Sequence, residues 1–268
     1  MSLDTAPSDD EWHRYNRRHR IARFALLLVA AVVLYASWGA LNVRYDFALS
    51  APVQLADLFG RMFPPDVGYT GEIIAPLIET IHIAILGTGL AVVLGLPVAF
   101  LSAHNTTPNR LTHLLGKFII SFTRSVNVII WALFFVVIFG PGALAGVASV
   151  AVRSVGFTAK LLGEAIEEID FGQVEAITAT GASRLLVLVY AIVPQIKPAF
   201  VGITTYRWDI NVRAATILGF VGAGGIGVEL TTRVSTYDWS GVLTILLAIL
   251  AVVIVSEVLS AYFRKKVS

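Results

Sequence analysis

The stretch IIAPLIETIHIAILGTGLAVVLGLPVAFLS occupies residues 73–102. Its only ionisable side chains are those of Glu79 and His82. About 20 consecutive apolar residues are enough for a helix to cross the hydrocarbon core of a bilayer. The run therefore predicts a transmembrane helix, with a kink at Pro97. The rest of the chain follows the same trend, because 56% of its 268 residues are hydrophobic, only 14% are charged and its mean hydropathy is +0.77. Soluble domains carry about 25% charged residues, so the composition predicts an integral membrane protein.

Further apolar runs predict a chain of six transmembrane helices. The expected spans are residues 23–41, 73–102, 126–140, 143–163, 186–220 and 240–262. The first run is too long for the apolar core of a signal peptide, which favours an uncleaved anchor. An amphipathic segment at 111–124 leads into the third span, and Pro194 and Pro198 are expected to break the fifth. The fold class expected is all-α integral membrane, with residues 1–22 as an N-terminal arm and residues 23–268 as a single transmembrane domain.

The distribution of basic residues predicts the orientation. Basic clusters lie at residues 14–23, 110–124 and 264–266, whereas the expected loop at 42–72 carries only Arg44 and Arg61. Loops rich in Lys and Arg stay in the cytoplasm. Both termini are therefore expected in the cytoplasm, and so is the polar segment 164–185.

Several kinds of site have no sequence signal. The chain has no cysteine, which excludes disulfides and thiolate metal sites. It has no Gly-x-x-x-x-Gly-Lys-Ser/Thr loop for ATP phosphates, and its net charge of +2 is not gathered into a basic stripe. We therefore expect no catalytic, cofactor-binding or metal-binding residue in this chain, and no nucleic-acid partner.

A motif of small residues lies in the segment expected in the cytoplasm. Glu175 and Ala176 are followed by Gly181 and then by Pro194. This spacing resembles the Glu-Ala-Ala signature of permeases of ATP-binding-cassette (ABC) importers. Apolar residues replace the usual apolar ones at three other positions, namely Ile177 for Ala, Ala191 for Ile and Val193 for Leu.

Each matching residue also has a physical reason. A short helix with small residues can approach a partner closely, Gly181 permits a tight turn, and Pro194 marks a bend. The resemblance implies a cytoplasmic coupling helix that contacts an ATPase. An ordinary loop with a capping glycine is the alternative.

Two longer blocks resemble permeases of phosphonate importers. They read YRWDINVRAATILGFVGAGGIG at residues 206–227 and, with Asn127 where Pro is expected, RSVNVIIWALFFVVIFGPGALAGVASVAVRSVGFTAKLLGEAIEEID at residues 124–170. Methionine-type permeases share a weaker version of the first block. The resemblance covers roughly residues 70–265 and leaves the N-terminal arm and the first span unassigned.

The resemblance implies a type I ABC importer in the bacterial cytoplasmic (inner) membrane. Such an importer has two permease subunits, expected here to be a homodimer of this chain, two ATPase subunits that bind ATP and Mg, and an external solute-binding protein. The implied function is a translocation path for phosphonate or a related phosphorus oxyanion. The sequence leaves open which phosphorus compound is carried, whether the dimer is a homodimer or a heterodimer, and what the N-terminal arm does.

A glycine cluster follows the fifth expected span, at Gly222, Gly224, Gly225 and Gly227. The pattern GxGxxG binds dinucleotides only where it follows a strand and opens a helix. Here it follows a transmembrane helix, so nucleotide binding is not expected. Glycines instead permit a break and close helix packing, which predicts part of an external gate. A simple helix terminator is the alternative.

Ionisable residues inside spans are candidates for functional sites. In the fifth span, Arg207, Asp209 and Arg213 are assigned to a possible substrate path, where guanidinium groups would bind an oxyanion. Asp209 and Arg213 lie four residues apart, so a structural pair along one helix face is the alternative. Arg153 in the fourth span would lie either at a dimer interface or in a water-filled cavity.

Other functions stay open. A methionine-type or other small-solute ABC permease would share the architecture. A secondary transporter would carry its own ion coupling, usually with inverted repeats and midplane carboxylates, and the sequence shows no convincing internal repeat. A purely structural membrane protein would not need the pattern from Glu175 to Pro194.

Overall fold

The computed structural model describes residues 17–41 and 44–267, and these residues form helices and short connections without a strand. Residues 1–16 of the expected N-terminal arm lie outside the described residues. In chain order the elements are α1 (Arg17–Ala40), α2 (Tyr45–Met62), η1 (Val67–Tyr69), α3 (Thr70–Ser102), α4 (Arg110–Ser125), α5 (Val128–Phe139), α6 (Ala143–Glu167), α7 (Phe171–Ala179), α8 (Arg184–Val187), η2 (Leu188–Ile192), α9 (Val193–Leu218), η3 (Gly219–Val221), α10 (Ile226–Ser235) and α11 (Trp239–Val267). The all-α class expected from the sequence is confirmed.

The chain divides into two compact units, residues 1–57 and residues 58–268. In the first unit, α1 is apolar and the described side chains along it are exposed, as suits a helix surrounded by lipid. The expected loop at 42–72 instead contains the helix α2. Apolar and polar residues are mixed along α2, so the sequence gives no signal for a membrane span there. Such a mixed sequence can still form a helix, because a helix does not need a continuous apolar run.

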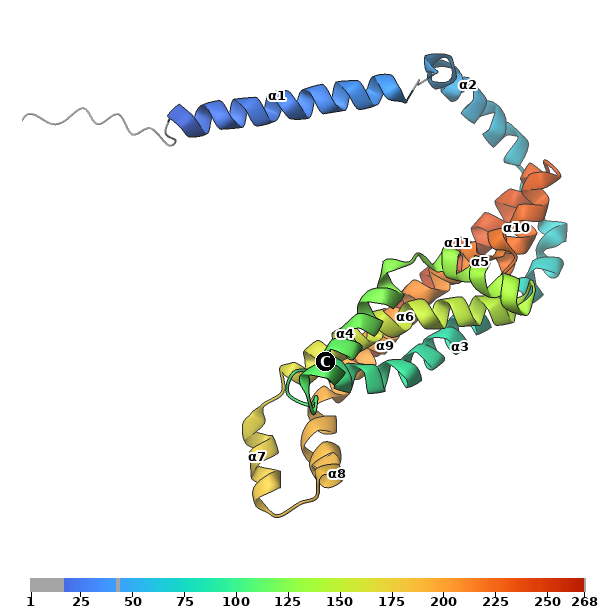
Figure 1. Cartoon of the computed structure of the whole chain (residues 1–268). Coiled ribbons are helices and arrows are strands. Elements are labelled where there is room, and N and C mark those ends of the chain that lie inside the picture. The colour runs from blue at the N-terminus through green and yellow to red at the C-terminus, as the bar shows by residue number, and fades with distance from the viewer. Residues whose placement is uncertain (1–16, 42–43, 268) are drawn as a thin grey trace, which may run out of the picture. The chain divides into compact units, whose positions relative to one another are not determined.

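The second unit is a helix bundle in which α3 and α6 pack along their length, with α9 against both (Figure 1). Small residues allow the close approach, as is common between helices in membranes. A Cβ atom on Gly87 of α3 would lie 2.5 Å from Val150 Cγ1, and one on Gly95 would lie 3.4 Å from Thr158. The core of the bundle therefore depends on glycines at the α3–α6 contact.

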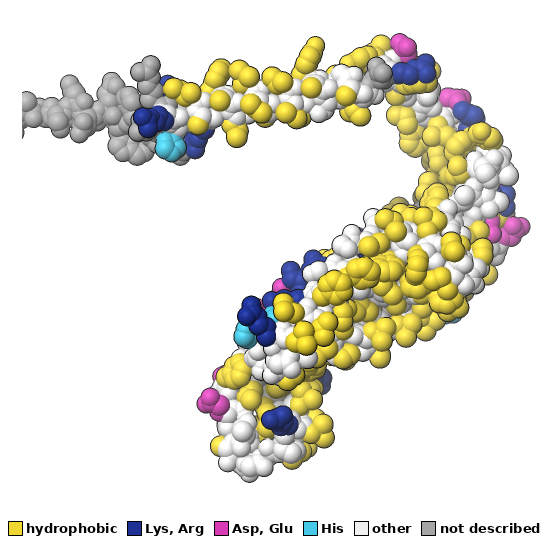
Figure 2. All heavy atoms as spheres, viewed as in Figure 1, with side chains coloured by type: hydrophobic (Ala, Val, Ile, Leu, Met, Phe, Trp, Pro, Cys, Tyr) yellow, Lys and Arg dark blue, Asp and Glu magenta, His cyan; other side chains and the backbone are white. Residues whose placement is uncertain are grey.

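Five helical segments among the described residues are long and apolar enough to cross a membrane, and a bent pair makes up to six. The five are Arg18–Ala40, Val67–Ser102, Ala143–Glu167, Arg184–Val221 and Trp239–Lys266. Figure 2 shows hydrophobic side chains over the middle of the bundle and charged side chains toward its ends. This distribution fits a bundle whose outer face contacts lipid.

The third expected span differs from the structure. Within residues 126–140 the helix α5 has only 12 residues, and it reaches span length only together with α4, from which it bends by 91°. At about 1.5 Å per residue, α5 alone is too short for a hydrocarbon core of about 30 Å. The bend comes at Val126 and Asn127, whose backbone is extended; Asn127 Oδ1 accepts a hydrogen bond from the Ile129 N–H and so caps α5.

The fifth span is not broken at Pro194, because α8, η2 and α9 follow one another without a gap, but a π-helical turn lies just before this proline. Residues Leu188–Ile192 form one π-helical turn, in which the Val193 N–H donates to the Leu188 carbonyl five residues earlier. A proline has no N–H for the α-helical bond, and a π-turn is a common way to accommodate such an interruption. Pro198, the other expected break, lies inside the continuous helix α9.

The helices α7 and α8 project beyond one end of the bundle (Figure 1). Asp170 Oδ1 accepts from the Gly172 N–H at 2.8 Å and caps the start of α7. Gly181 follows α7 with a φ of +78°, a left-handed conformation that favours glycine. The chain thereby turns back into α8 and α9.

Candidate functional site

A chain of buried polar side chains crosses the centre of the bundle. Arg207 of α9 is only 3% exposed, and its Nη2 donates to Ser154 Oγ of α6 at 3.1 Å. Ser154 Oγ donates to Asn211 Oδ1 at 2.9 Å, and Asn211 Nδ2 donates to Thr88 Oγ1 of α3 at 2.9 Å. Thr88 Oγ1 ends the chain by donating to the Ala84 carbonyl. The three core helices are therefore linked by directed hydrogen bonds.

Three guanidinium groups surround the ring of Phe157 on α6. Their Cζ atoms lie 4.5 Å (Arg124), 5.5 Å (Arg153) and 4.6 Å (Arg207) from the ring centroid. They come from α4, α6 and α9, so the cluster forms only when these helices pack together. We call these four residues the arginine cluster.

The arginine cluster contains no compensating carboxylate. Among the residues that the structure describes, no Asp or Glu forms an ion pair with Arg124, Arg153 or Arg207. The Nε atoms of Arg207 and Arg124 are buried and have no hydrogen-bond partner there. Buried charges are normally paired, because an unpaired one is costly. The cluster is thus an exception within the bundle.

A glycine brings Arg124 to this position. A Cβ atom on Gly156 would lie 2.8 Å from the Ile120 carbonyl oxygen and 2.9 Å from Arg124 Cγ. The helix α4 therefore lies directly on α6 at this point. Neither Arg124 nor Phe157 is among the residues predicted from the sequence, because an arginine at the end of an amphipathic segment looks like an ordinary interfacial residue.

The other two charged residues predicted for the substrate path form a separate pair. Asp209 and Arg213 of α9 are joined by a salt bridge, and the Ser256 hydroxyl of α11 donates to Asp209 Oδ1 at 2.7 Å. The Asp209 side chain is 7% exposed and that of Arg213 is 50% exposed. The structure thus contains the Asp209–Arg213 pair along one helix face, which was the alternative to a substrate path for these two residues. Arg207 belongs to the arginine cluster instead.

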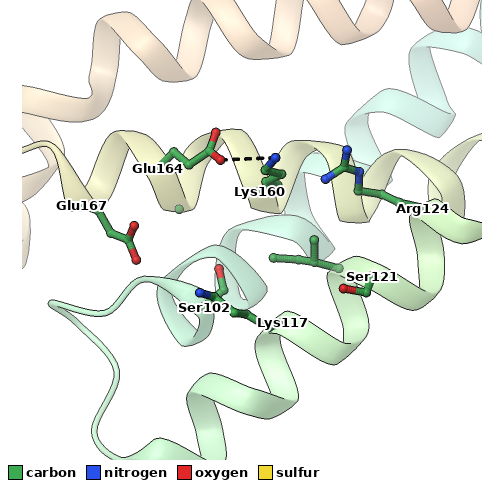
Figure 3. Close-up of a pocket in the computed structure, with 9 residues that line it drawn as sticks. Ser102, Lys117, Ser121, Arg124, Lys160, Glu164 and Glu167 are labelled. Atoms are coloured by element: carbon green, nitrogen blue, oxygen red, sulfur yellow. Dashed lines mark ion pairs between the residues drawn. The ribbon is translucent and has the colours of Figure 1, made fainter. Parts of the chain in front are cut away.

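A cleft of about 260 Å³ opens beside the arginine cluster. It is lined by residues of α3, α4 and α6, namely Ser102, Lys117, Ile120, Ser121, Arg124, Lys160, Gly163, Glu164 and Glu167. Figure 3 shows Glu164 and Glu167 toward one end of the cleft and Arg124 toward the other. Lys160 and Glu164 pair at 3.5 Å. Arg124 belongs to both the cleft and the cluster.

The predicted glycine gate is a break packed against α3 and α6. Gly222, Gly224 and Gly225 have φ of +79°, +80° and +76°, so they adopt backbone conformations that other residues rarely take. Thr80 Oγ1 accepts from the Ile226 N–H at 2.8 Å, which fixes the start of α10. Gly227 lies at the beginning of α10, where a Cβ atom would meet the Thr216 carbonyl at 2.5 Å.

An ionic cluster lies at the α10 end of the bundle. Arg233 Nη1 donates to Asp238 Oδ2 at 2.8 Å, its Nη2 lies 3.6 Å from Glu72 Oε2, and its Cζ lies 3.7 Å from the centroid of the Tyr69 ring. The Tyr69 hydroxyl donates to Glu229 Oε2 at 2.7 Å. A hydrogen bond from the Gly241 N–H lowers the pKa of Asp238 below its ordinary value, and the bond from Arg233 adds to this effect.

The residues predicted for coupling lie at the opposite end. Glu175 and Ala176 are exposed on α7, Gly181 forms the turn, and Pro194 begins α9. The Asp170 N–H donates to Gln195 Oε1 at 2.8 Å, which ties the start of α7 to α9. The start of α7 is therefore bonded to the helix that carries Arg207.

The comparison with known sequences decides the class of protein. The sequence family described as "Binding-protein-dependent transport system inner membrane component" matches residues 91–268. The chain belongs to this family. It is therefore an inner-membrane transport permease that crosses the bilayer several times and works with an ATPase and a solute-binding protein.

Relatives and solved structures agree with this assignment. The chain is 40% identical over 238 residues to the phosphite transport system permease protein PtxC of Stutzerimonas stutzeri, covering 89% of this chain and 86% of that one. It is 36% identical over 224 residues to the phosphate-import permease protein PhnE of Mycolicibacterium smegmatis, covering 82% of this chain and 42% of that one. A structure of the MetNI methionine ABC transporter superposes with a TM-score of 0.66 at 22% identity, over 76% of this chain and 99% of that one. The expected type I importer permease fold is confirmed.

Proposed function

We propose that this permease forms, with a second copy of itself, the path through which an ATP-driven importer moves a phosphorus oxyanion such as phosphite, phosphonate or phosphate into the cell. The observation that carries the proposal is the 40% identity, over 89% of the chain, to a permease named for phosphite transport. The relative named for phosphate import supports the same class of substrate. The methionine transporter contributes the fold alone.

The chain itself is proposed to be non-catalytic. ATP and Mg would be bound by the separate ATPase subunits, because no phosphate-binding loop is present in this sequence. Both termini would lie in the cytoplasm, on the same side as α7. The glycine break at Gly222–Gly227 would then lie toward the outside and form part of the external gate.

Coupling is proposed to pass through α7. Movement of the ATPases would displace the exposed surface around Glu175 and Ala176, and the hydrogen bond between Asp170 and Gln195 would transmit it to α9. From Arg207 the polar chain through Ser154 and Asn211 reaches the other two core helices. The permease would convert this motion into a change of access.

Co-purification tests the proposal. The tagged chain is extracted in mild detergent and its companions are identified by mass spectrometry, and uptake of labelled phosphite, phosphate, methylphosphonate and methionine is measured in cells. We expect an ATPase with its own phosphate-binding loop at equal stoichiometry, and uptake of a phosphorus oxyanion. A chain that purifies alone would contradict the importer and favour a secondary transporter, and uptake of methionine alone would contradict the substrate.

Variants in α7 test the coupling. Glu175→Lys and Gly181→Pro should abolish uptake while membrane insertion stays normal, because the first reverses a charge on the exposed surface and the second cannot adopt a positive φ. Gln173→Lys is the matched control, since residues two apart on a helix do not share a face. Normal uptake in both Glu175→Lys and Gly181→Pro would refute the coupling role.

A further inference from the structure

We propose that Arg124, Arg153 and Arg207 form an anion-binding site inside the bundle, where a tetrahedral phosphorus oxyanion is held during translocation. The charge and the geometry of these residues support the site. Only the identity of its anion rests on the proposed function.

The charge of the arginine cluster has no counterion among the described residues. Three guanidinium groups lie within 5.5 Å of the Phe157 ring centroid, and in the described part of the chain none of them has a carboxylate partner. The face of the phenyl ring attracts cations, but this offsets only part of the cost of burying Arg207, which is 3% exposed. A bound anion would supply the missing negative charge.

The hydrogen-bonding groups of the cluster also lack an acceptor. The Nε atoms of Arg207 and Arg124 are buried without a partner among the described residues. The guanidinium group is a planar fork of donors that matches the oxygens of phosphate-like anions. Ser154 accepts from Arg207 Nη2 while it donates to Asn211, which orients the Arg207 fork. The unused donors of Arg207 are therefore held in place.

A cleft reaches the edge of the cluster at Arg124. Arg124 lines the cleft of about 260 Å³, which is several times the roughly 30 Å³ that a water molecule occupies in the liquid. Glu164 and Glu167 lie toward one end of the cleft and Arg124 toward the other (Figure 3). The lining thus changes from mixed charge to positive charge toward the arginine cluster, as a path for an anion requires.

Equilibrium binding tests the site directly. The permease, with the subunits that co-purify with it, is placed in nanodiscs, and binding of labelled inorganic phosphate, phosphite and sulfate is measured without ATP or solute-binding protein. Arg207→Gln and Arg124→Gln should each weaken binding by about ten- to hundredfold, as expected for a lost hydrogen bond between charged groups. Arg207→Lys keeps the charge but not the fork, so it should recover only part of the affinity.

Arg110→Gln is the matched control, because Arg110 is an exposed arginine in the first turn of the same helix as Arg124. It should bind anions as the wild type does. Equal binding in wild type, Arg207→Gln and Arg124→Gln would refute the site, as would a wild type that binds none of the anions. A loss of equal size in Arg110→Gln would show a general charge effect and would also refute it.

A lipid headgroup carries the same phosphate chemistry, and the bilayer composition separates the two sources. We expect the same phosphate affinity in nanodiscs of neutral phosphatidylcholine and of anionic phosphatidylglycerol. Binding that disappears in phosphatidylglycerol would mean that headgroups occupy the site, which overturns the substrate role.

The outcome also separates this inference from the proposed function. Phosphite uptake that persists in Arg207→Gln would refute the site and leave the importer intact. Conversely, Arg207-dependent binding of sulfate without binding of phosphate or phosphite would support an anion site and contradict the proposed substrate.

Discussion

Arg233 and Arg207 both lie over an aromatic ring, yet their surroundings differ in charge. Arg233 lies 3.7 Å from the Tyr69 ring centroid and contacts the carboxylates of Glu72 and Asp238. Arg207 lies 4.6 Å from the Phe157 ring centroid, next to two further arginines and, among the described residues, without a carboxylate. The charge of Arg233 is thus neutralised in a contact that holds helices together, whereas Arg207 lies in a region of excess positive charge. Charge balance separates a structural arginine from a candidate binding residue where ring contacts alone do not.

The sharpest test replaces Arg207 by methionine, which has a long side chain but no charge. Uptake of the phosphorus oxyanion should fall by about tenfold or more, because charged hydrogen bonds to the anion are lost. The melting temperature should stay the same or rise, since an unpaired buried charge is removed. Uptake and thermal unfolding of the purified complex check both parts. A large drop in melting temperature would show that Arg207 is structural and would remove the difference from Arg233.

Gly156→Ala should separate α4 from α6 and so displace Arg124. The added Cβ would lie within 3 Å of the Ile120 carbonyl and of Arg124 Cγ, and overpacking of this kind costs about 1–3 kcal/mol. Denaturant titration in detergent and the phosphate-binding assay measure the effects on stability and on the anion site. Gly89→Ala in α3 is the control, because a Cβ there meets no atom within 4 Å. If Gly156→Ala bound phosphate normally, Arg124 would have no part in the site.

Arg233→Met should act in the opposite way to Arg207→Met. It leaves Glu72 and Asp238 without their cation, so the free energy of unfolding should fall by about 1 kcal/mol, a modest value because these groups are partly exposed. Anion binding at the arginine cluster should not change. The same unfolding and binding assays apply, and reduced anion binding would contradict the separation of the two regions.

The smallest expected effect is a dependence on pH at the α10 end. The pKa of Asp238 is lowered by the Gly241 N–H and by Arg233, so its contribution to stability is present above the unfolded-state pKa of about 3.9. That contribution is lost as the pH falls through the lower pKa of the folded state. The melting temperature should therefore decrease below about pH 4, and less so in Asp238→Asn. An identical pH profile in this variant would contradict the role of Asp238.

The broad architecture could be read from hydropathy, and the turns could be read from glycine and proline. Gly181 and the cluster at Gly222, Gly224 and Gly225 were predicted as turn or break positions and do adopt positive φ. The helix α2 and the short α5 were not foreseen, because a mixed-polarity helix and a bend at Asn127 have no strong hydropathy signal. Roles in gating and coupling at these positions stay predictions.

For the candidate site, the sequence alone determined that charged residues enter the fifth span, since Arg207, Asp209 and Arg213 interrupt an apolar run. Their spacing also allowed an Asp209–Arg213 pair on one helix face. Only the tertiary structure decided that Arg207 joins Arg124 and Arg153 around Phe157, because these residues lie on three helices far apart in sequence. Hydropathy and helical period describe one segment at a time, whereas the contact of α4 with α6 at Gly156 and of α9 with both depends on packing between segments.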